Sequence, residues 1–379
     1  MMSQNGNSVK IISQFNWDFS DLKQSERQYS VHFFHPYPAK FIPQIPSRAI
    51  KILSKPGDIV LDPFMGSGTT LIEAKYQGLN SIGLDTNPLA VKIAKAKTVS
   101  NNKRNMEEIS NFLQWLYAIQ EREDSIKNDP IDDQLFINSH LWFRKDVESK
   151  IKIIIDEFEK FSPEVKNFLQ VGLSSILKGI SNARMDSIIP ILPNEPTYID
   201  RKHYYRIVDN NTRKIPVFNR FYLQLKKMKD AIYEFSQKTD KNLKCKSIVG
   251  DSRNLTKYIQ YCDLVITSPP YWSAQNYEEN QKLSFELYGL NTLKGNEIGR
   301  DKNVYLDDMK IVFRQIAKIL NGYFVFVMGE DLQNSFHQKL LMLLLDIGFD
   351  HIDTAIRKIS NQTSRAKIIQ KEFIYLLKI

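Results

Sequence analysis

Cysteine is nearly absent from this chain, which has two among 379 residues, Cys245 and Cys262. Their spacing provides neither a metal-ligand pattern nor a disulfide framework, and this fits a reducing compartment. Neither cysteine is flanked like an activated nucleophile. We therefore expect both to be small core residues, and we expect the chemistry of the protein to proceed without a covalent cysteine adduct.

Long apolar runs are also missing, because no run reaches the roughly 18 residues that a membrane span needs. The first residues, Met1 to Asn7, lack the basic and then apolar pattern of a secretory signal. These absences predict a soluble, cytoplasmic protein. At 42% apolar residues, the chain can bury one large core or two smaller ones.

Acidic residues are fewer than basic ones, with 43 Asp and Glu against 52 Lys and Arg, so the formal net charge is +9. A positive balance of this size suits a polyanionic partner such as nucleic acid. Ribosomal and membrane-surface proteins share the same bias. Charge alone therefore leaves the class of partner open.

A rigid turn follows a buried strand in the second half of the chain. The apolar run Leu264 to Ile266 leads into Thr267-Ser268-Pro269-Pro270-Tyr271-Trp272. A run of this kind ending at two prolines predicts a strand that carries a turn to the carboxyl edge of a sheet, where ligand sites of α/β proteins form. The structural alternative is a proline turn that closes an edge, with its aromatics packed in the core.

The residues of this turn suit a planar amine. Prolines lack an N–H, so Ser268 and Pro269 can present acceptors without a competing local donor. The Ser268 hydroxyl and the Pro269 carbonyl could accept from both N–H groups of an exocyclic amine and help push its lone pair out of plane. Tyr271 adds a flat face on which a base lifted from a duplex can stack.

A second strand and a glycine loop lie near the N-terminus. Asp58 to Leu61 leads into Asp62-Pro63-Phe64-Met65-Gly66-Ser67-Gly68-Thr69-Thr70, and a helix follows. The glycines allow close approach to a ligand, and the helix N-terminus offers free N–H groups to a carboxylate. Further strands end at Asp85 and at Asp251.

Together, the proline turn and the glycine loop resemble the amino-group DNA methyltransferases, which use S-adenosylmethionine to methylate N4 of cytosine or N6 of adenine. The resemblance covers roughly half of the chain. It implies the class I methyltransferase fold, an α/β Rossmann-like and mostly parallel sheet with a C-terminal antiparallel strand, here with a helix-rich insertion. It also implies double-stranded DNA as the substrate, a prokaryotic location on the nucleoid when bound, and a cognate restriction endonuclease as a candidate partner.

The resemblance assigns roles to individual residues. The predicted catalytic residues are Ser268, Pro269, Pro270 and Tyr271. The predicted cofactor-binding residues are Lys40, Phe41, Asp62, Pro63, Phe64, Gly66, Ser67, Gly68, Thr69, Asp85, Asp251 and Ser268. Asp85 should bind ribose hydroxyls, and Asp251 should accept from the cofactor's adenine amine. The segment from His32 to Pro43 should close over the methionine end of the cofactor. No metal is expected, and we favour packing or stacking roles for His32 and His35 over a metal site.

Spacing along the chain predicts its division into parts. We expect an N-terminal arm at 1–30, anchored by Phe15, Trp17 and Phe19, and a catalytic domain at 31–99 and 244–379. The gap between Asp85 and Asp251 exceeds one crossover, so 100–243 should be an inserted helical lobe and a candidate DNA target-recognition region. Two sets of apolar residues at helical spacing support this. They are Ile109, Phe112, Leu113, Leu116 and Ile119, and Ile151, Ile154, Ile155, Phe158 and Phe161. A polar loop is expected at 273–303.

One basic stretch within the lobe favours a nucleic-acid face over a solvated helix side. Arg201 to Lys229 carries nine basic residues against the single acid Asp209, with aromatics between them, Phe218 and Phe221 included. The predicted nucleic-acid-binding residues are Arg201, Lys202, Tyr204, Arg206, Arg213, Lys214 and Arg220, with Arg365 and Lys367 near the C-terminus.

Serine at position 268 resembles the cytosine-N4 group, whereas the adenine-N6 group more often has Asp or Asn before Pro-Pro-Tyr. We therefore predict a site-specific cytosine-N4 DNA methyltransferase, the modification part of a restriction-modification system. Adenine-N6 methylation, methylation of an RNA amine and a non-catalytic nucleic-acid-binding module stay open as alternatives.

Overall fold

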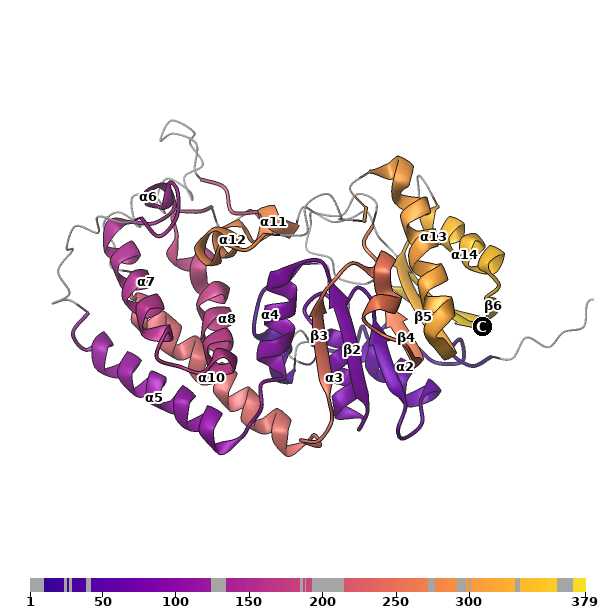
Figure 1. Cartoon of the computed structure of the whole chain (residues 1–379), viewed down its shortest axis with the longest axis horizontal. Coiled ribbons are helices and arrows are strands. Elements are labelled where there is room, and N and C mark those ends of the chain that lie inside the picture. Colours follow the sequence, from indigo (N-terminus) through magenta and orange to yellow (C-terminus); the bar gives the residue numbers. More distant parts are fainter. Residues whose placement is uncertain are drawn as a thin grey trace, which may run out of the picture.

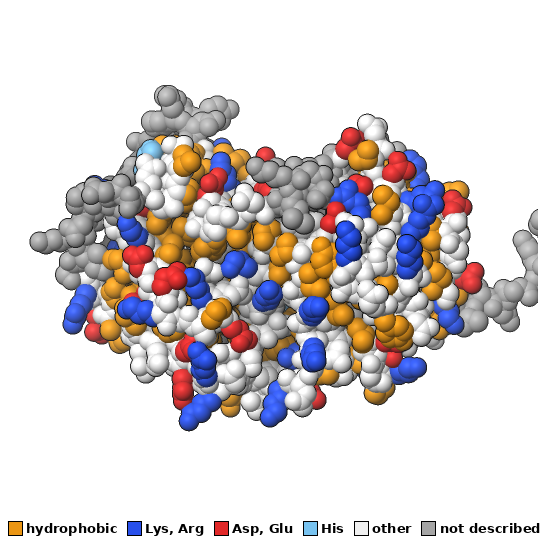
Figure 2. All heavy atoms as spheres, in the orientation of Figure 1, with side chains coloured by type: hydrophobic (Ala, Val, Ile, Leu, Met, Phe, Trp, Pro, Cys, Tyr) orange, Lys and Arg blue, Asp and Glu red, His pale blue; other side chains and the backbone are white. Residues whose placement is uncertain are grey.

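The computed structural model describes residues 10–23, 26, 29–38, 42–123, 134–184, 187, 189–192, 215–271, 277–291, 298–299, 301–330, 335–359 and 371–379. Within these ranges no helix is both long and apolar enough to cross a membrane. On the face shown in Figure 2, lysine and arginine side chains are scattered among acidic and apolar ones.

A seven-stranded sheet organises the chain, in the order β3-β2-β1-β4-β5-β7-β6. The strands are β1 (Ile59–Asp62), β2 (Asn80–Asp85), β3 (Cys245–Val249), β4 (Cys262–Thr267), β5 (Leu320–Gly329), β6 (Asp350–Lys358) and β7 (Lys371–Lys378). Strands β1 to β5 pair in parallel, and β7 runs antiparallel to β5 and β6. This confirms the predicted class I methyltransferase fold and its antiparallel C-terminal pair.

Alternating side chains on the central strands separate two apolar layers, as the period of two in a strand requires. Leu264 and Ile266 of β4 face the cluster that contains α2 (Gln44–Leu53) and part of α3 (Thr69–Tyr76). Val265 faces the opposite cluster, which contains η2 (Ser252–Lys257), α13 (Lys302–Ile319) and α14 (Phe336–Ile347). Figure 1 shows the sheet with α13 and α14 at one end.

The N-terminal residues pack against the first of these layers. Ile12, Trp17 and Phe19 are buried there, whereas Phe15 is 41% exposed. The Asp353 carboxylate in β6 accepts hydrogen bonds from three successive backbone N–H groups, at residues 11 to 13. Two of the three predicted anchoring aromatics are thus confirmed. A short 3-10 helix, η1 (Ser30–Phe33), follows.

Helices form the described part of the chain between β2 and β3. They are α4 (Pro88–Lys97), α5 (Lys103–Gln120), α6 (Ser139–Trp142), α7 (Lys145–Phe158), α8 (Pro163–Ile180) and α10 (Val217–Gln237). The two predicted sets of apolar residues at helical spacing are confirmed, because their side chains are buried in or packed against one apolar cluster. That cluster also includes Leu89 and Ile93 of α4, so the helices at the left of Figure 1 share a continuous core with α4.

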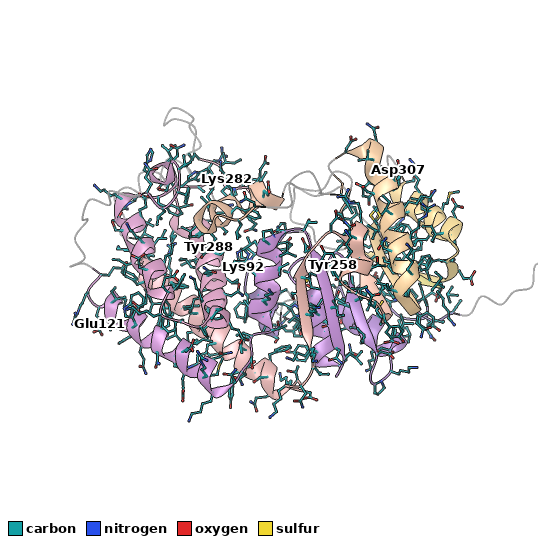
Figure 3. The ribbon with its side chains drawn as sticks, viewed as in Figure 1. Lys92, Glu121, Tyr258, Lys282, Tyr288 and Asp307 are labelled. Carbon is teal, nitrogen blue, oxygen red and sulfur yellow. The ribbon has the colours of Figure 1, made fainter. Side chains whose placement is uncertain are left out.

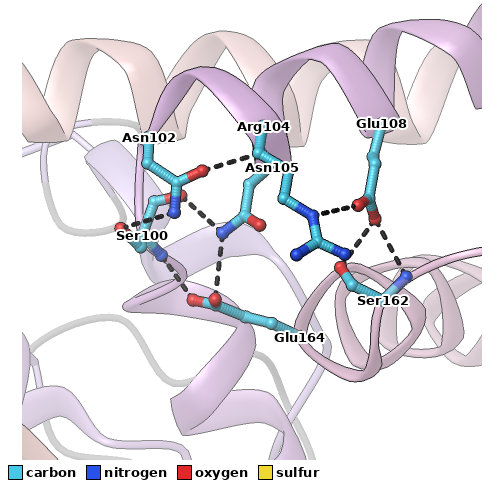
Figure 4. A network of polar contacts seen from close by, with 7 residues as sticks. All are labelled: Ser100, Asn102, Arg104, Asn105, Glu108, Ser162 and Glu164. Carbon is cyan, nitrogen blue, oxygen red and sulfur yellow. Dashed lines mark hydrogen bonds and ion pairs between the residues drawn. The ribbon is translucent and has the colours of Figure 1, made fainter.

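Polar contacts connect the start of this helical group with α8 (Figure 4). The Glu164 carboxylate accepts from the Ser100 backbone N–H at 2.7 Å and from the Asn105 side chain at 2.9 Å. One turn further along α5, Glu108 accepts from the backbone N–H and the hydroxyl of Ser162. These bonds fix the N-terminus of α8 against α5.

The structure corrects two expectations. Phe218 and Phe221 are fully buried in the helical core, so the prediction that they stack on nucleic acid is wrong. The described part of 273–303 is not a plain loop, because it contains α11 (Tyr277–Asn280), α12 (Lys282–Tyr288) and the first two residues of α13. Helix α12 packs on α8, and Lys92 of α4 lies 6.0 Å from the ring centre of Tyr288 (Figure 3).

Candidate functional site

The Asp62 carboxylate connects the two predicted motifs. It lies at the end of β1 and accepts from the Thr267 hydroxyl at the end of β4, from the Thr70 hydroxyl in α3 and from the Phe64 backbone N–H, at 2.7, 2.7 and 3.1 Å. Strands β1 and β4 are parallel neighbours, so their carboxyl ends meet at one edge. The glycine loop and the proline turn therefore lie side by side.

Burial changes the acidity of this carboxylate. Asp62 is 1% exposed, and burial raises its pKa from 3.8 to about 6, although its three hydrogen bonds lower the pKa in part. These donors occupy both oxygens. Asp62, predicted to bind the cofactor, is thus seen to hold the loop and the turn together.

The two glycines of the loop are required by their surroundings. Gly66 has φ +49° and would place a Cβ 3.3 Å from the ring of Tyr37. Gly68 has φ +83°, and its Cβ would come within 2.9 Å of the Ala94 side chain in α4. A side chain at either position would be strained and crowded. The loop therefore lies tightly between the N-terminal segment and α4.

The residues of the loop fit the methionine part of S-adenosylmethionine. The first-turn N–H groups of α3, at Thr69, Thr70 and Leu71, donate to no other described residue. The Ser67 hydroxyl is buried and has no hydrogen-bond partner within the described ranges. A helix N-terminus with free donors is a suitable site for an anionic group. Phe64 packs nearby in the same apolar cluster as Tyr271.

Asp85 ends β2 beside this loop. One carboxylate oxygen accepts from the Gly66 backbone N–H at 2.9 Å, and the other accepts from the Asn87 backbone N–H at 2.8 Å. These bonds orient the carboxylate at the carboxyl edge of the sheet, where the prediction requires a ribose acceptor.

Asp251 lies at the end of the neighbouring strand and has a partner that the sequence analysis missed. Arg253 donates to both of its carboxylate oxygens and also to Asp308 in α13. These charged groups raise the pKa of the Arg253 guanidinium, chiefly through the bond to Asp251. The bonds from the Arg253 guanidinium fix the Asp251 side chain. An adenine ring that contacts Asp251 would therefore lie beside Arg253.

Hydrogen bonds fix the proline turn at Pro270 and Tyr271. The Tyr271 hydroxyl accepts from the Gly329 backbone N–H at 2.9 Å, and the Pro270 carbonyl accepts from the Tyr305 hydroxyl at 2.9 Å. By contrast, Ser268 and Pro269 make no hydrogen bond with another residue that the structure describes. Among the described residues, no donor therefore occupies these two acceptors.

His32 and His35 have structural partners, and both cysteine thiols are weakly acidic. His32 contacts Glu73 through Nε2 at 2.8 Å, and His35 contacts the Ser174 hydroxyl at 2.7 Å, and both side chains are buried. Burial raises the pKa of the Cys262 thiol to about 12 and also raises that of Cys245. Thiols with raised pKa values are poor nucleophiles at neutral pH.

Several predicted site residues lie outside the described ranges, namely Lys40, Phe41, Arg201, Lys202, Tyr204, Arg206, Arg213, Lys214, Arg365 and Lys367. Of the predicted nucleic-acid-binding residues, Arg220 is described. It is half-buried, and its guanidinium donates to the Gly179 carbonyl at 2.6 Å. This bond lies inside the helical group and connects α10 with α8.

Three positioning side chains escaped the sequence analysis: Arg253, Tyr305 and Lys97, whose ammonium donates to the Ser67 carbonyl. Arg253 stands two residues after Asp251, and this proximity could have suggested the pair. Tyr305 falls just beyond the expected loop at 273–303, so nothing in the pattern marked it. Lys97 is one of several lysines on its helix, so the sequence pattern did not single it out.

Comparison with known proteins finds similarity to methyltransferases. A family model described as DNA methylase matches residues 3–96. Type II methyltransferase M.MjaII of Methanocaldococcus jannaschii is 24% identical, over 98% of this chain and 84% of that protein. Type II methyltransferase M.MvaI of Kocuria varians is 27% identical, over 77% of this chain and 65% of that protein. Among solved structures, the rRNA methyltransferase aviRa of Streptomyces viridochromogenes has a TM-score of 0.37 at 10% identity, covering 94% of this chain and 92% of that one.

Replacing Tyr305 by Phe should slow the reaction without weakening cofactor binding. The change leaves the Pro270 carbonyl without its donor and loosens the turn, so we expect kcat to fall about tenfold with an unchanged KM for S-adenosylmethionine. Tyr288→Phe is a matched control, since it removes a buried hydroxyl that donates to the Gln170 carbonyl, away from the turn. Steady-state kinetics of both variants tests this, and equal kcat losses would contradict it.

Replacing Asp62 by Asn should change how stability depends on pH. The raised pKa means that the folded wild type holds an extra proton between about pH 4 and pH 6. Wild-type stability relative to Asp62→Asn should therefore decrease as pH rises through this window, by about 1–3 kcal/mol. Urea unfolding of both proteins at about pH 4.5 and about pH 7.5 measures this. If the stability of wild type minus that of Asp62→Asn stays constant, or grows, as pH rises, then burial does not raise the pKa of Asp62.

Proposed function

We propose that this chain, an S-adenosylmethionine-dependent DNA methyltransferase of the amino-group family, methylates the exocyclic N4 amine of a cytosine flipped out of duplex DNA. The observation that carries the proposal is the Asp62 contact with Thr267 and Thr70, which joins the glycine loop to the proline turn. A cofactor on the loop and a base on the turn would then lie close enough to react directly.

The cofactor would supply a methyl group on a positively charged sulfur, and the side chains would position the two reactants. Asp85 would accept from the ribose hydroxyls, and the first turn of α3 would receive the methionine carboxylate. On the other side, the Ser268 hydroxyl and the Pro269 carbonyl would accept from the amine. These bonds draw the amine's lone pair toward the methyl carbon, so catalysis would come from positioning and polarisation.

Tyr271 would hold the flipped base. Its hydroxyl is fixed to Gly329 at the end of β5, so the ring has a set orientation before a base arrives. Stacking on an aromatic ring contributes about 1–3 kcal/mol per base. The pre-set ring would reduce the entropy lost when the base enters.

Serine at position 268 supports cytosine as the target base. Adenine-N6 methylation is the second candidate, because the same two acceptors would serve either amine. An RNA amine would need the same chemistry. A non-catalytic binding module has less support, since both the glycine loop and the free acceptors of the turn are intact.

We propose duplex DNA as the substrate and a restriction-modification system as the setting, with a cognate endonuclease as partner. The M.MjaII and M.MvaI names as Type II methyltransferases support this setting. The helical lobe at 100–243 would contact DNA through the basic stretch at 201–214, with a second contact at Arg365 and Lys367. Helix α10 would give that stretch a fixed attachment, because Phe218 and Phe221 are anchored in the core.

Nucleoside mass spectrometry and methylation-sensitive sequencing of DNA from a host expressing the protein would test this function. We expect N4-methylcytosine within one fixed sequence motif. Tyr271→Ala should abolish the modification, whereas Tyr271→Phe, which keeps the flat ring, should retain most of it.

The other outcomes separate the alternatives. N6-methyladenine would overturn the cytosine assignment and keep the amino-group chemistry. Methylation of structured RNA but not duplex DNA by the purified protein would show that the substrate is RNA. Cofactor binding with no turnover on either nucleic acid would favour the binding module.

A further inference from the structure

The Asp251 carboxylate lies beside Asp85 at the carboxyl edge of the sheet. Strands β3 and β2 pair in parallel, and the Gly250 backbone N–H donates to the Asp85 carbonyl at 3.0 Å. The Ser252 hydroxyl donates to the Pro63 carbonyl, so the chain after β3 is also attached to the start of the glycine loop. Asp251 therefore belongs to the same edge as the residues proposed to hold the cofactor.

Arg253 uses most of the acceptor capacity of Asp251. Its backbone N–H and its Nε donate to one carboxylate oxygen at 2.9 and 3.1 Å, and its Nη2 donates to the other at 2.7 Å. The Nε group is shared, because it also lies 3.0 Å from the second oxygen. A carboxylate can accept about four hydrogen bonds, so these three N–H groups leave room for about one more. That remaining acceptor suits a single N–H group of a ligand.

The orientation of this acceptor depends on Asp308 in α13. The Nη1 group of Arg253 donates to the Asp308 carboxylate at 2.9 Å, so the guanidinium lies between two carboxylates from different elements. Helix α13 has a fixed position, because Met309 and Val312 are fully buried. A planar guanidinium that is bound at both ends is restrained from rotating, and it holds the Asp251 carboxylate in one orientation.

The Asp308 side chain has one role that can be isolated. Among the residues that the structure describes, its hydrogen-bond and ion-pair partner is Arg253. A separate contact docks η2 on α13, since the side-chain oxygen of Gln315 accepts from the Thr256 backbone N–H at 3.1 Å and from the Thr256 hydroxyl at 2.7 Å. Removal of the Asp308 carboxylate therefore releases one end of the guanidinium and leaves the packing of η2 in place.

We propose that Asp308 is a positioning residue for cofactor recognition, which acts through Arg253 to direct the remaining acceptor of Asp251 toward the exocyclic amine of the cofactor's adenine. The inference rests on the proposed function, since it requires S-adenosylmethionine at this edge of the sheet. Asp308 acts at a distance and does not touch the ligand. A carboxylate held in one orientation accepts from an amine N–H and repels a carbonyl oxygen at the same place, so the arrangement selects adenine.

Calorimetric titration with S-adenosylhomocysteine and with S-inosylhomocysteine tests the proposal, because the second ligand carries a carbonyl oxygen in place of the adenine amine. Wild type should bind the adenine ligand at least about tenfold more tightly. Asp308→Ala should reduce this preference about fivefold, because the Asp251 acceptor is no longer held in position before the ligand binds. Binding of the inosine ligand should change less than about twofold.

Asp307→Ala is the matched control. Asp307 is the neighbouring residue of α13 and carries the same charge, but its side chain is exposed (Figure 3). Both ligands should bind this variant as they bind wild type. Asp308→Asn, which keeps an acceptor oxygen for Arg253 without the charge, should reduce the preference by a smaller factor. It also serves as the second variant should the alanine substitution fail to fold.

The contrary outcomes are distinct. A preference that Asp308→Ala leaves unchanged, whether both ligands weaken equally or neither weakens, would overturn the positioning role. Equal affinity of wild type for the two ligands would also overturn it, and this result requires no variant. A wild type that binds neither ligand would instead overturn the proposed function.

Discussion

The structure depends on one buried carboxylate at the junction of two strands. Asp62 accepts hydrogen bonds from its own turn, from the helix that follows the glycine loop and from the last residue of β4. Burial of this group is unfavourable, as its raised pKa indicates, and the three donors compensate in part. The parallel pairing of β1 and β4 makes this arrangement possible, because neighbouring parallel strands end at the same edge of the sheet. Two motifs about 200 residues apart in the chain thus become one site.

Elements outside the motifs support each side of this junction. Helix α4 packs on the glycine loop through Ala94 and holds the Ser67 carbonyl through Lys97. On the other side, α13 fixes the proline turn through Tyr305 and steadies Asp251 through the contact of Arg253 with Asp308. Each of these helices also buries side chains in an apolar cluster, so core packing and site geometry are coupled. Side chains that face a ligand need this kind of support to keep their orientation.

Sequence patterns predicted the parts of the fold that depend on local periodicity. Apolar runs ending at Asp85, Asp251 and the proline turn located the strands, and the motifs located the sheet edge. Tertiary partners carry no such local pattern. Tyr305 and Lys97 act across the fold, and only the packing of α13 and α4 brings them to the site, whereas Arg253 stands two residues after Asp251. The same limit explains the error at Phe218 and Phe221: basic neighbours suggested an exposed face, but their spacing on α10 directs these rings into the helical core.

A crystal structure with bound S-adenosylhomocysteine would test the central claim most directly, namely that the glycine loop and the proline turn form one methyl-transfer site. The account predicts ribose hydroxyls within hydrogen-bond distance of Asp85, the carboxylate at the first turn of α3, and the sulfur directed toward Ser268 and Pro269. A ligand bound elsewhere, or one whose sulfur points away from the proline turn, would contradict it.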